Sequence, residues 1–213
     1  RMGVKECVVL VNGLWLGDPA LWLLAWRLRR AGFRVHIFSY PSVRHDLLTN
    51  AARLRDFLAR VPGEIVHIVG YSLGGLVVRA LFHLQSPPRP GRIVLLGSPQ
   101  TGNRAAQMLA QRHLGAKLLG HSVADLIAGL PQRWSWPARE TGVIAGSRSL
   151  GLGRLVARLA VPNDGSVAVE ETVVAGAHVQ LVLPLAHFAL LLAPVVARQI
   201  AQFLRHGRFE SRC

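Results

Sequence analysis

The sequence predicts an α/β fold in which a mostly parallel sheet is flanked by helices. Short apolar runs alternate with amphipathic segments of helical spacing along the N-terminal half of the chain. The apolar runs lack period-two alternation, which is expected of strands covered by helices on both faces. The chain has 213 residues, of which 51% are hydrophobic. That is enough for one domain with its own core, and too apolar for intrinsic disorder.

Strands are predicted where aliphatic and β-branched residues cluster between turn residues. The first strand runs from Glu6 to Val11 and ends at Asn12-Gly13. Further strands are expected over residues 33–40, 65–70, 92–96, 141–145 and 177–183. Because helical segments separate most of these runs, we expect βαβ units with parallel pairing.

Helices are predicted between the strands. Asp18-Pro19 is typical of a helix start and Gly32 of a helix end. Further helices are expected over residues 47–58, 73–84, 104–114 and 188–204. The region from Ser98 to Glu140 leaves room for one helix on the sheet and a small cap within residues 115–140. We therefore expect a single domain over residues 1–213, with a minimal lid or none.

The charge and the apolar segments limit the partners. Lys and Arg total 25 against 11 Asp and Glu, a formal net charge of +14. There is no run of five cations, no aromatic–basic interleaving of the kind that stacks bases, and no basic helix with an apolar opposite face. We expect no specific nucleic-acid partner, and at most a peripheral contact with an anionic lipid surface. Pro184, His187 and Pro194 interrupt the apolar residues 179–197, which favours two buried elements over a transmembrane segment.

The cysteines and histidines predict neither a metal site nor a cofactor. Cys7 and Cys213 lie at opposite ends of the chain, and the nine histidines are scattered without metal-ligand spacing. No signal peptide is visible, which favours the cytoplasm.

A nucleophile is predicted at Ser72, in the segment Gly70-Tyr71-Ser72-Leu73-Gly74. The pattern follows the apolar run 65–69 and precedes a helical run, the strand–turn–helix context of a nucleophile elbow. Glycines leave space where strand and helix crowd together, and the helix start offers backbone N–H groups to an oxyanion. The alternative is an ordinary turn with a helix-capping serine.

A serine nucleophile needs a base, and His187 is the candidate. It follows the last predicted strand and so lies at the carboxyl edge of the sheet, where Ser72 also lies. His178 would lie at the opposite edge, and His206 ends the last helix, where a cation suits the helix dipole.

The orienting acid is predicted at Asp164. The carboxylates between the serine and the histidine are Asp125, Glu140, Asp164, Glu170 and Glu171. Asp164 stands in a turn cluster, Pro162 to Val167, from which a loop can reach His187. Asp125 lies in a helical segment, and the adjacent Glu170 and Glu171 are expected to face solvent. The alternative role for Asp164 is that of an Asx-turn residue.

Two backbone N–H groups and several apolar side chains complete the predicted site. The N–H groups of Leu14, after the first strand, and Leu73, after the serine, are the candidate oxyanion donors. An apolar acyl pocket is expected from Trp15, Leu150, Leu152 and Leu155, with Trp134-Ser135-Trp136 as its mouth or cap. The alternative for each is plain packing.

Together these residues resemble the α/β-hydrolase superfamily, from Val8 to about Phe203. More narrowly, the chain resembles small bacterial esterases and lipases related to the GPI-inositol-deacylase group. The motifs that carry the narrower resemblance are Gly70–Gly75, Leu96–Asn103 and Asn163–Val167. It departs from the group at Asn12, where His is frequent, and at Gln100, again in place of His.

The resemblance implies a single-domain α/β-hydrolase fold and a carboxylic ester hydrolase. Ser72, His187 and Asp164 would form its triad, acting through an acyl-enzyme on a small-molecule or lipid ester, with no cofactor. The same triad serves an acyltransferase or perhydrolase, and a non-catalytic scaffold on the same fold is the alternative of a different class.

Overall fold

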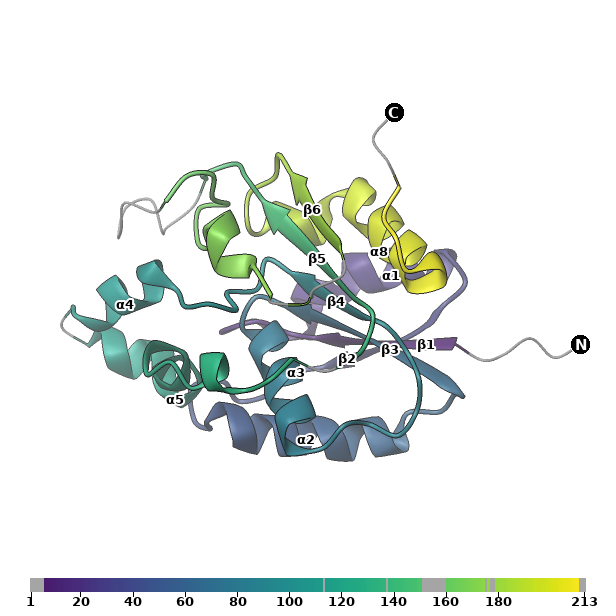
Figure 1. Cartoon of the computed structure of the whole chain (residues 1–213), viewed down its shortest axis with the longest axis horizontal. Coiled ribbons are helices and arrows are strands. Elements are labelled where there is room, and N and C mark those ends of the chain that lie inside the picture. The colour runs from purple at the N-terminus through teal and green to yellow at the C-terminus, as the bar shows by residue number, and fades with distance from the viewer. Residues whose placement is uncertain are drawn as a thin grey trace, which may run out of the picture.

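A parallel sheet of six strands forms the centre of the molecule (Figure 1). The structure is a computed structural model that describes residues 6–112, 114–136, 138–150, 160–174, 176 and 179–210. The strand order is β2-β1-β3-β4-β5-β6, and every neighbouring pair is parallel. This confirms the predicted class. The strands are β1 (Glu6–Val11), β2 (Arg34–Phe38), β3 (Ile65–Tyr71), β4 (Ile93–Leu96), β5 (Thr141–Gly146) and β6 (Val179–Leu183).

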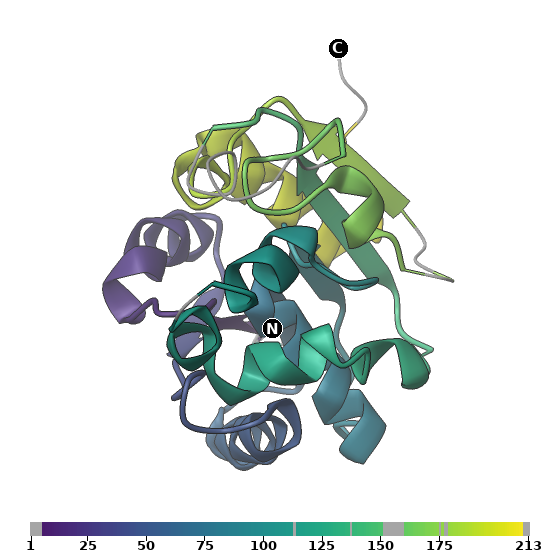
Figure 2. The same cartoon turned by 90° about the vertical axis from the view of Figure 1, so that its left-hand side faces the viewer.

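Helices cover both faces of the sheet (Figures 1 and 2). One face carries α1 (Trp22–Arg30), which continues the 3-10 turn η1 (Asp18–Leu21), together with α7 (Ala189–Leu192) and α8 (Pro194–His206). The other face carries α2 (Leu47–Arg60) and α3 (Leu73–Leu84). The helices α4 (Arg104–Ala110) and α5 (Gly115–Ile127) lie beyond the carboxyl ends of the strands, at the left of Figure 1. The short 3-10 turns η2 (Pro131–Arg133) and η3 (Val169–Thr172) lie in the connections on either side of β5.

The sheet separates two apolar cores, and the first strand contributes to both. Val8 and Leu10 pack with α1 and α8, whereas Val9 and Val11 pack with α2 and α3. Successive side chains of a strand point to opposite faces, so a strand buried on both sides is apolar throughout. This explains why the strands of this chain read as continuous apolar runs.

Three predicted elements differ from the structure. The helix expected over 104–114 ends as α4 at Ala110, and Leu114 adopts φ 66° just before α5 begins. The helix expected over 188–204 is broken into α7 and α8, with Ala193 extended at ψ 129° between them. The cause is Pro194, because a proline disfavours the helical conformation of the residue before it. The strand expected from residue 177 is seen from Val179, and residues 177 and 178 lie outside the described part of the chain.

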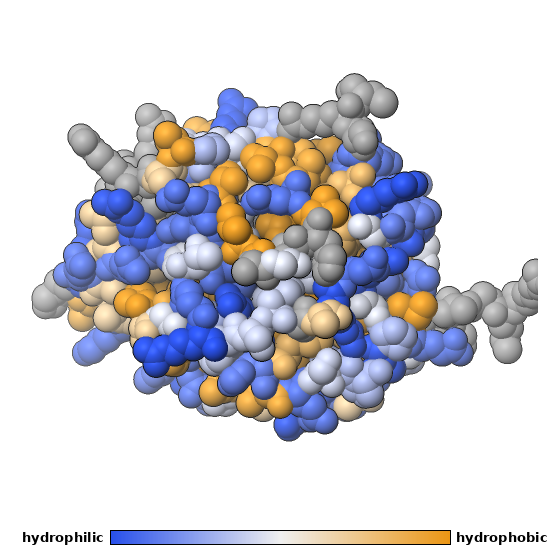
Figure 3. All heavy atoms as spheres, viewed as in Figure 1, coloured by the Kyte–Doolittle hydropathy of each residue, from blue (hydrophilic) through white to orange (hydrophobic). Residues whose placement is uncertain are grey.

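The last strand of the sheet, β6, is apolar and pairs with β5 and with no other strand of the described residues. Figure 3 shows apolar side chains gathered over this strand, where Val179 and Leu181 are only partly buried. Gln180 lies between them and is exposed. The carboxyl ends of the strands, by contrast, are surrounded by loops and by α4 and α5, and they hold the candidate site.

Candidate active site

Ser72 stands at a sharp turn between β3 and α3. Its backbone has φ 51° and ψ −123°, a conformation that residues other than glycine rarely adopt and that costs about 1–3 kcal/mol. The Ser72 N–H donates to the Leu96 carbonyl at 2.9 Å, which ties the turn to the end of β4. The chain therefore spends folding energy to hold this one side chain at the carboxyl edge of the sheet.

Glycines make that turn sterically feasible. A Cβ at Gly70 would lie 2.6 Å from the Gly75 Cα, so the strand and the helix could not approach as they do. A Cβ at Gly74 would lie 2.4 Å from the carbonyl oxygens of both Val11 and Asn12. The helix start thus packs directly against the end of β1, and this contact fixes Ser72 relative to the loop after β1.

Gly74→Ala is expected to destabilise the fold and to impair any chemistry at Ser72. The added methyl would meet backbone atoms that cannot rotate away, and overpacking of this kind costs about 1–3 kcal/mol in the free energy of unfolding. Urea unfolding measures it. The matched control is Gly17→Ala, whose methyl would meet only the Pro19 Cδ at 3.5 Å. Equal stability of the two variants would contradict the expectation.

The structure brings His187 and Asp164 to Ser72. The His187 Nε2 lies 3.0 Å from the Ser72 Oγ, and its Nδ1 lies 2.6 Å from the Asp164 Oδ2. The three residues come from the turn after β3, the loop after β6 and the loop after β5. His187 keeps part of its ring exposed, whereas Asp164 is only 1% exposed. A serine, an imidazole and a buried carboxylate are therefore joined in one hydrogen-bonded row.

Asp164 is held by its own loop. Its second oxygen, Oδ1, accepts the N–H groups of Ser166 at 2.9 Å and Val167 at 2.8 Å. The His187 N–H donates to the Asp164 carbonyl at 2.9 Å, so the loops of the acid and the histidine are also joined through the backbone. The Asx turn considered as an alternative is thus present, and the same carboxylate serves both the turn and His187.

Tyr71, which precedes the serine, contacts His187 through both its hydroxyl and its ring. Its hydroxyl donates to the His187 carbonyl at 3.2 Å, and its ring lies 5.0 Å from the imidazole. Burial, reinforced by the nearby Asp164 carboxylate, raises the pKa of the Tyr71 phenol far above its usual value. The phenol therefore stays protonated and remains a donor.

The loop after β1 lies against Ser72, with Asn12 as its anchor. The buried Asn12 amide donates to the carbonyl of Leu16 and to Ser39 Oγ, both at 3.1 Å, and its oxygen accepts the Gly13 N–H. A Cβ at Gly13 would lie 3.3 Å from the Ser72 Cβ. Asn12 stands where the esterase group that the sequence resembles often has His, and its side chain anchors the loop after β1.

The candidate oxyanion donors flank the serine. Leu73 is the first residue of α3, whose opening N–H groups have no partner within the helix. Leu14 follows Gly13 on the anchored loop, and no hydrogen bond from its N–H is seen to any described residue. Neither N–H group donates a hydrogen bond to another described residue.

Glu171 is a residue that the sequence analysis placed wrongly. It does not face solvent: its carboxylate accepts the N–H groups of Arg104 at 2.7 Å and Ala168 at 2.8 Å, and its carbonyl accepts those of Gln100 and Thr101. Burial raises the pKa of Glu171, and the two N–H groups oppose that rise. Glu171 thus joins the loop after β4 to the loop that carries Asp164.

The structure describes two of the four predicted pocket residues, Trp15 and Leu150. Trp15 is exposed, with φ 60°, and its indole N–H donates to the Leu118 carbonyl of α5 at 2.8 Å. Leu150 is about half exposed, and its backbone packs on Gly165, next to Asp164. Leu152 and Leu155 lie outside the described residues.

The expectation that Trp134-Ser135-Trp136 forms a mouth is wrong. Trp134 is buried and stacks on His83 of α3 at 5.1 Å. Trp136 donates to the Thr141 hydroxyl at 3.0 Å, at the amino end of β5. These rings therefore pack away from Ser72.

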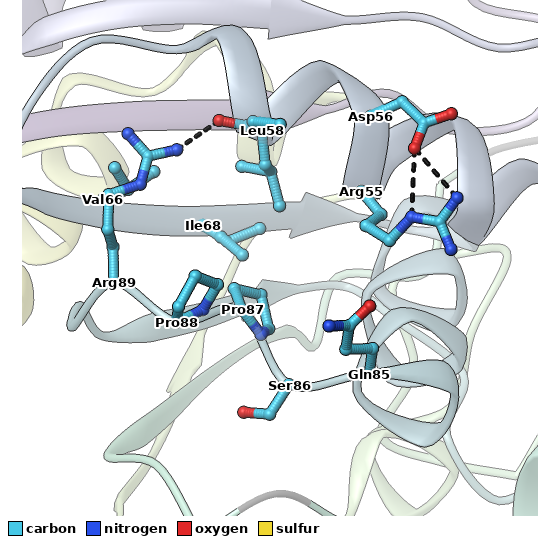
Figure 4. Close-up of a pocket in the computed structure, with 11 residues that line it drawn as sticks. Arg55, Asp56, Leu58, Val66, Ile68, Gln85, Ser86, Pro87, Pro88 and Arg89 are labelled. Atoms are coloured by element: carbon cyan, nitrogen blue, oxygen red, sulfur yellow. Dashed lines mark hydrogen bonds and ion pairs between the residues drawn. The ribbon is translucent and has the colours of Figure 1, made fainter.

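A pocket lies on the α2–α3 side of the sheet, away from the carboxyl ends of the strands where Ser72 lies (Figure 4). Leu58 at the end of α2, Val66 and Ile68 of β3, and Pro87-Pro88 after α3 line it. Since α3 leads away from Ser72, this pocket is separate from the candidate site. Within the described ranges no group of His, Cys, Asp and Glu could hold a metal ion. None of the described helices combines the length and the apolarity of a membrane span.

Fold and site together define a class: α/β proteins with a serine, a histidine and an aspartate gathered at the carboxyl edge of a parallel sheet. Residues 8–209 match the alpha/beta hydrolase family, and the chain belongs to that family. No curated protein sequence matches it significantly.

Solved structures of esterases and lipases share the fold. A lipase from Bacillus licheniformis in its mature form superimposes with a TM-score of 0.78 at 19% identity, covering 97% of this chain and 94% of its own. A metagenomic carboxyl esterase gives 0.68 at 18% identity, covering 87% of this chain and 65% of its own. A meta-cleavage product hydrolase gives 0.60 at 14% identity, covering 94% of this chain and 91% of its own. At such identities the likeness establishes the fold.

Proposed function

We propose that this protein is a carboxylic ester hydrolase, an esterase or lipase, that uses Ser72 as its nucleophile. The observation that carries the proposal is the hydrogen-bonded row Ser72–His187–Asp164, with distances of 3.0 and 2.6 Å. A structural role for these residues would not require the rare backbone conformation of Ser72. The likeness to solved esterases and lipases is consistent with this activity.

In the proposed reaction His187 Nε2 takes the Ser72 proton while Oγ attacks the ester carbonyl carbon. The carbonyl oxygen becomes an oxyanion, and the imidazolium then gives its proton to the departing alcohol as the C–O bond breaks. Water then attacks the acyl carbon while His187 Nε2 takes its proton. The acyl–Oγ bond breaks, the imidazolium returns the proton to Ser72 Oγ, and the acid is released. Asp164 keeps the proton of the imidazole on Nδ1 and stabilises the imidazolium.

The oxyanion would be bound by the N–H groups of Leu14 and Leu73. Both flank Ser72, and preorganised donors of this kind supply a large share of the stabilisation of such a transition state. The Asn12 hydrogen bonds hold the Leu14 loop in advance, so no reorganisation is needed when the charge develops.

We assign residues 115–140 in part to a small cap. The helix α5 packs against the loops after β1 and β2, through Trp15 and through the hydrogen bond from the His121 N–H to the Val43 carbonyl. Of the predicted pocket residues, Trp15 and Leu150 are the described candidates for contact with the acyl chain. The narrower kinship with GPI-inositol-deacylase-like esterases remains a prediction; its second and third motifs touch where Asn103 donates to the Ser166 carbonyl.

Labelling with a fluorophosphonate tests the proposal. We expect the wild-type protein to hydrolyse p-nitrophenyl butyrate, to lose this activity on labelling, and to carry the label on the peptide that contains Ser72. The butyl ether of p-nitrophenol, which carries the same leaving group but has no acyl carbon, is the control for nonspecific colour release. Absence of both turnover and label would favour a non-catalytic scaffold.

A further inference from the structure

The outer side of α1 carries aromatic residues in an unusual place. The inner side, with Leu24, Ala25 and Leu28, is buried against the sheet. On the outer side Trp22 and Trp26, one turn apart, are 60% and 50% exposed. Single exposed apolar residues are common, but adjacent exposed tryptophans form a patch that calls for a partner. Figure 2 shows α1 at the periphery of the molecule.

A second exposed apolar pair adjoins the first. Phe188 and Leu192 lie four residues apart on α7 and its leading turn, 50% and 43% exposed. Arg27 of α1 donates a hydrogen bond to the Leu192 carbonyl, so the two helices lie side by side. We call Trp22, Leu23, Trp26, Phe188 and Leu192 the α1–α7 strip.

The strip begins at the candidate active site. Phe188 directly follows His187, and α1 begins on the carboxyl side of the sheet, after the loop that packs on Ser72. From that edge the strip runs outward along α1. A partner that covers the strip therefore lies beside the loop that carries His187.

Cations accompany the aromatic rings, and α1 has no carboxylate. Arg27, Arg29 and Arg30 occupy its last turns, and the Arg30 guanidinium lies 5.1 Å above the Trp26 ring. Tryptophan favours the boundary between lipid tails and headgroups, where one side of the ring is apolar and the other wet. Guanidinium groups bind phosphate in a bidentate manner. The net charge of +14 adds a long-range attraction to anionic surfaces.

We propose that the α1–α7 strip docks the protein on the surface of an anionic phospholipid bilayer. The rings enter the headgroup boundary, and Arg30, beside Trp26, meets lipid phosphate. The docking does not require the proposed hydrolase activity, whereas delivery of lipid esters to Ser72 rests on it. A second copy of the chain fits less well, because a two-fold contact through this strip would bring three arginines of each copy together.

Vesicle binding tests the proposal independently of turnover. We compare sedimentation of the protein with vesicles of phosphatidylcholine alone and of phosphatidylcholine and phosphatidylglycerol in equal parts. We expect binding to the anionic vesicles, with a blue shift of tryptophan emission. Trp22→Gln/Trp26→Gln should bind at least about tenfold more weakly. The control Leu48→Gln/Leu84→Gln removes two exposed leucines from α2 and α3, on the other face, and should bind like the wild type.

A charge pair separates local docking from general attraction. Arg30→Gln and Arg53→Gln each remove one cation, the first in the strip and the second on the exposed side of α2. We expect the first to weaken binding more than the second, while hydrolysis of a soluble ester stays unchanged in both. The proposal would be overturned if Arg30→Gln and Arg53→Gln weakened vesicle binding equally, or if Trp22→Gln/Trp26→Gln bound vesicles like the wild type. It would also be overturned if the wild type were a dimer and the double tryptophan variant a monomer.

Discussion

Ser72→Ala is expected to lower kcat for ester hydrolysis by about 10⁶-fold, the loss typical of an enzyme without its nucleophile. Without Oγ no acyl-enzyme can form, and the imidazole has no proton to accept from the position 3.0 Å away. KM should change little, because the small hydroxyl contributes to the transition state rather than to substrate binding. Steady-state kinetics with p-nitrophenyl butyrate measures both constants.

His187→Ala gives the decisive comparison. Residues that act as one unit lose activity together, so we expect Ser72→Ala/His187→Ala to be no slower than either single variant. His206→Ala, which changes the histidine at the end of α8, is the control and should retain wild-type kcat. Losses that multiply in the double variant would mean that the two residues act separately, and near-normal turnover of Ser72→Ala would refute the nucleophile.

The sheet was predictable because its signal is local. Each strand is an apolar run flanked by turn residues, and burial on both faces requires such a run whatever its neighbours are. The break at Ala193 was also encoded locally, in Pro194, but the apolar residues on both sides of it hid the break. The helical spacing of apolar residues continues across Pro194, whereas the helical backbone is interrupted at Ala193.

The segment after β4 was less predictable, because distant residues decide its shape. In α5 Gly120 adopts φ 77°, and a Cβ there would lie 2.3 Å from the Val43 Cα. The kink at Gly120 thus lies where the backbone of a loop that is far away in sequence packs against the helix. No periodicity within residues 115–127 carries that information.

The candidate site likewise contains residues with a local sequence signal and residues whose role depends on distant partners. The serine, the histidine and the aspartate were found from a five-residue pattern, from the order of the residues along the chain, and from the rule that parallel strands bring their following loops to one edge. Asn12 and Glu171 were missed as supporting residues. Their partners, such as Ser39 and Arg104, are distant in sequence, and a single Asn or Glu has no pattern that distinguishes an anchor from a surface residue.

Asp164→Asn is expected to lower kcat by about 10⁴-fold with little change in size at the site. Three donors converge on the Asp164 carboxylate: the imidazole at Oδ2, and the Ser166 and Val167 N–H groups at Oδ1. An amide has only one acceptor oxygen, so its NH₂ group must face one of these sets. If it faces His187, the imidazole proton moves to Nε2, which then cannot accept the Ser72 proton. If it faces the loop, two N–H groups lose their acceptor and the loop shifts.

Asp125→Asn is the matched control, since Asp125 also lies between Ser72 and His187 in the chain. It too accepts a backbone N–H, that of Leu47 at 2.8 Å, and burial raises the pKa of its carboxyl. It makes no contact with His187 among the described interactions. We expect its kcat to stay near that of the wild type, and urea unfolding to show both variants folded. If the two variants had equal kcat, or if Asp164→Asn raised KM alone, Asp164 would hold the loop without orienting the imidazole.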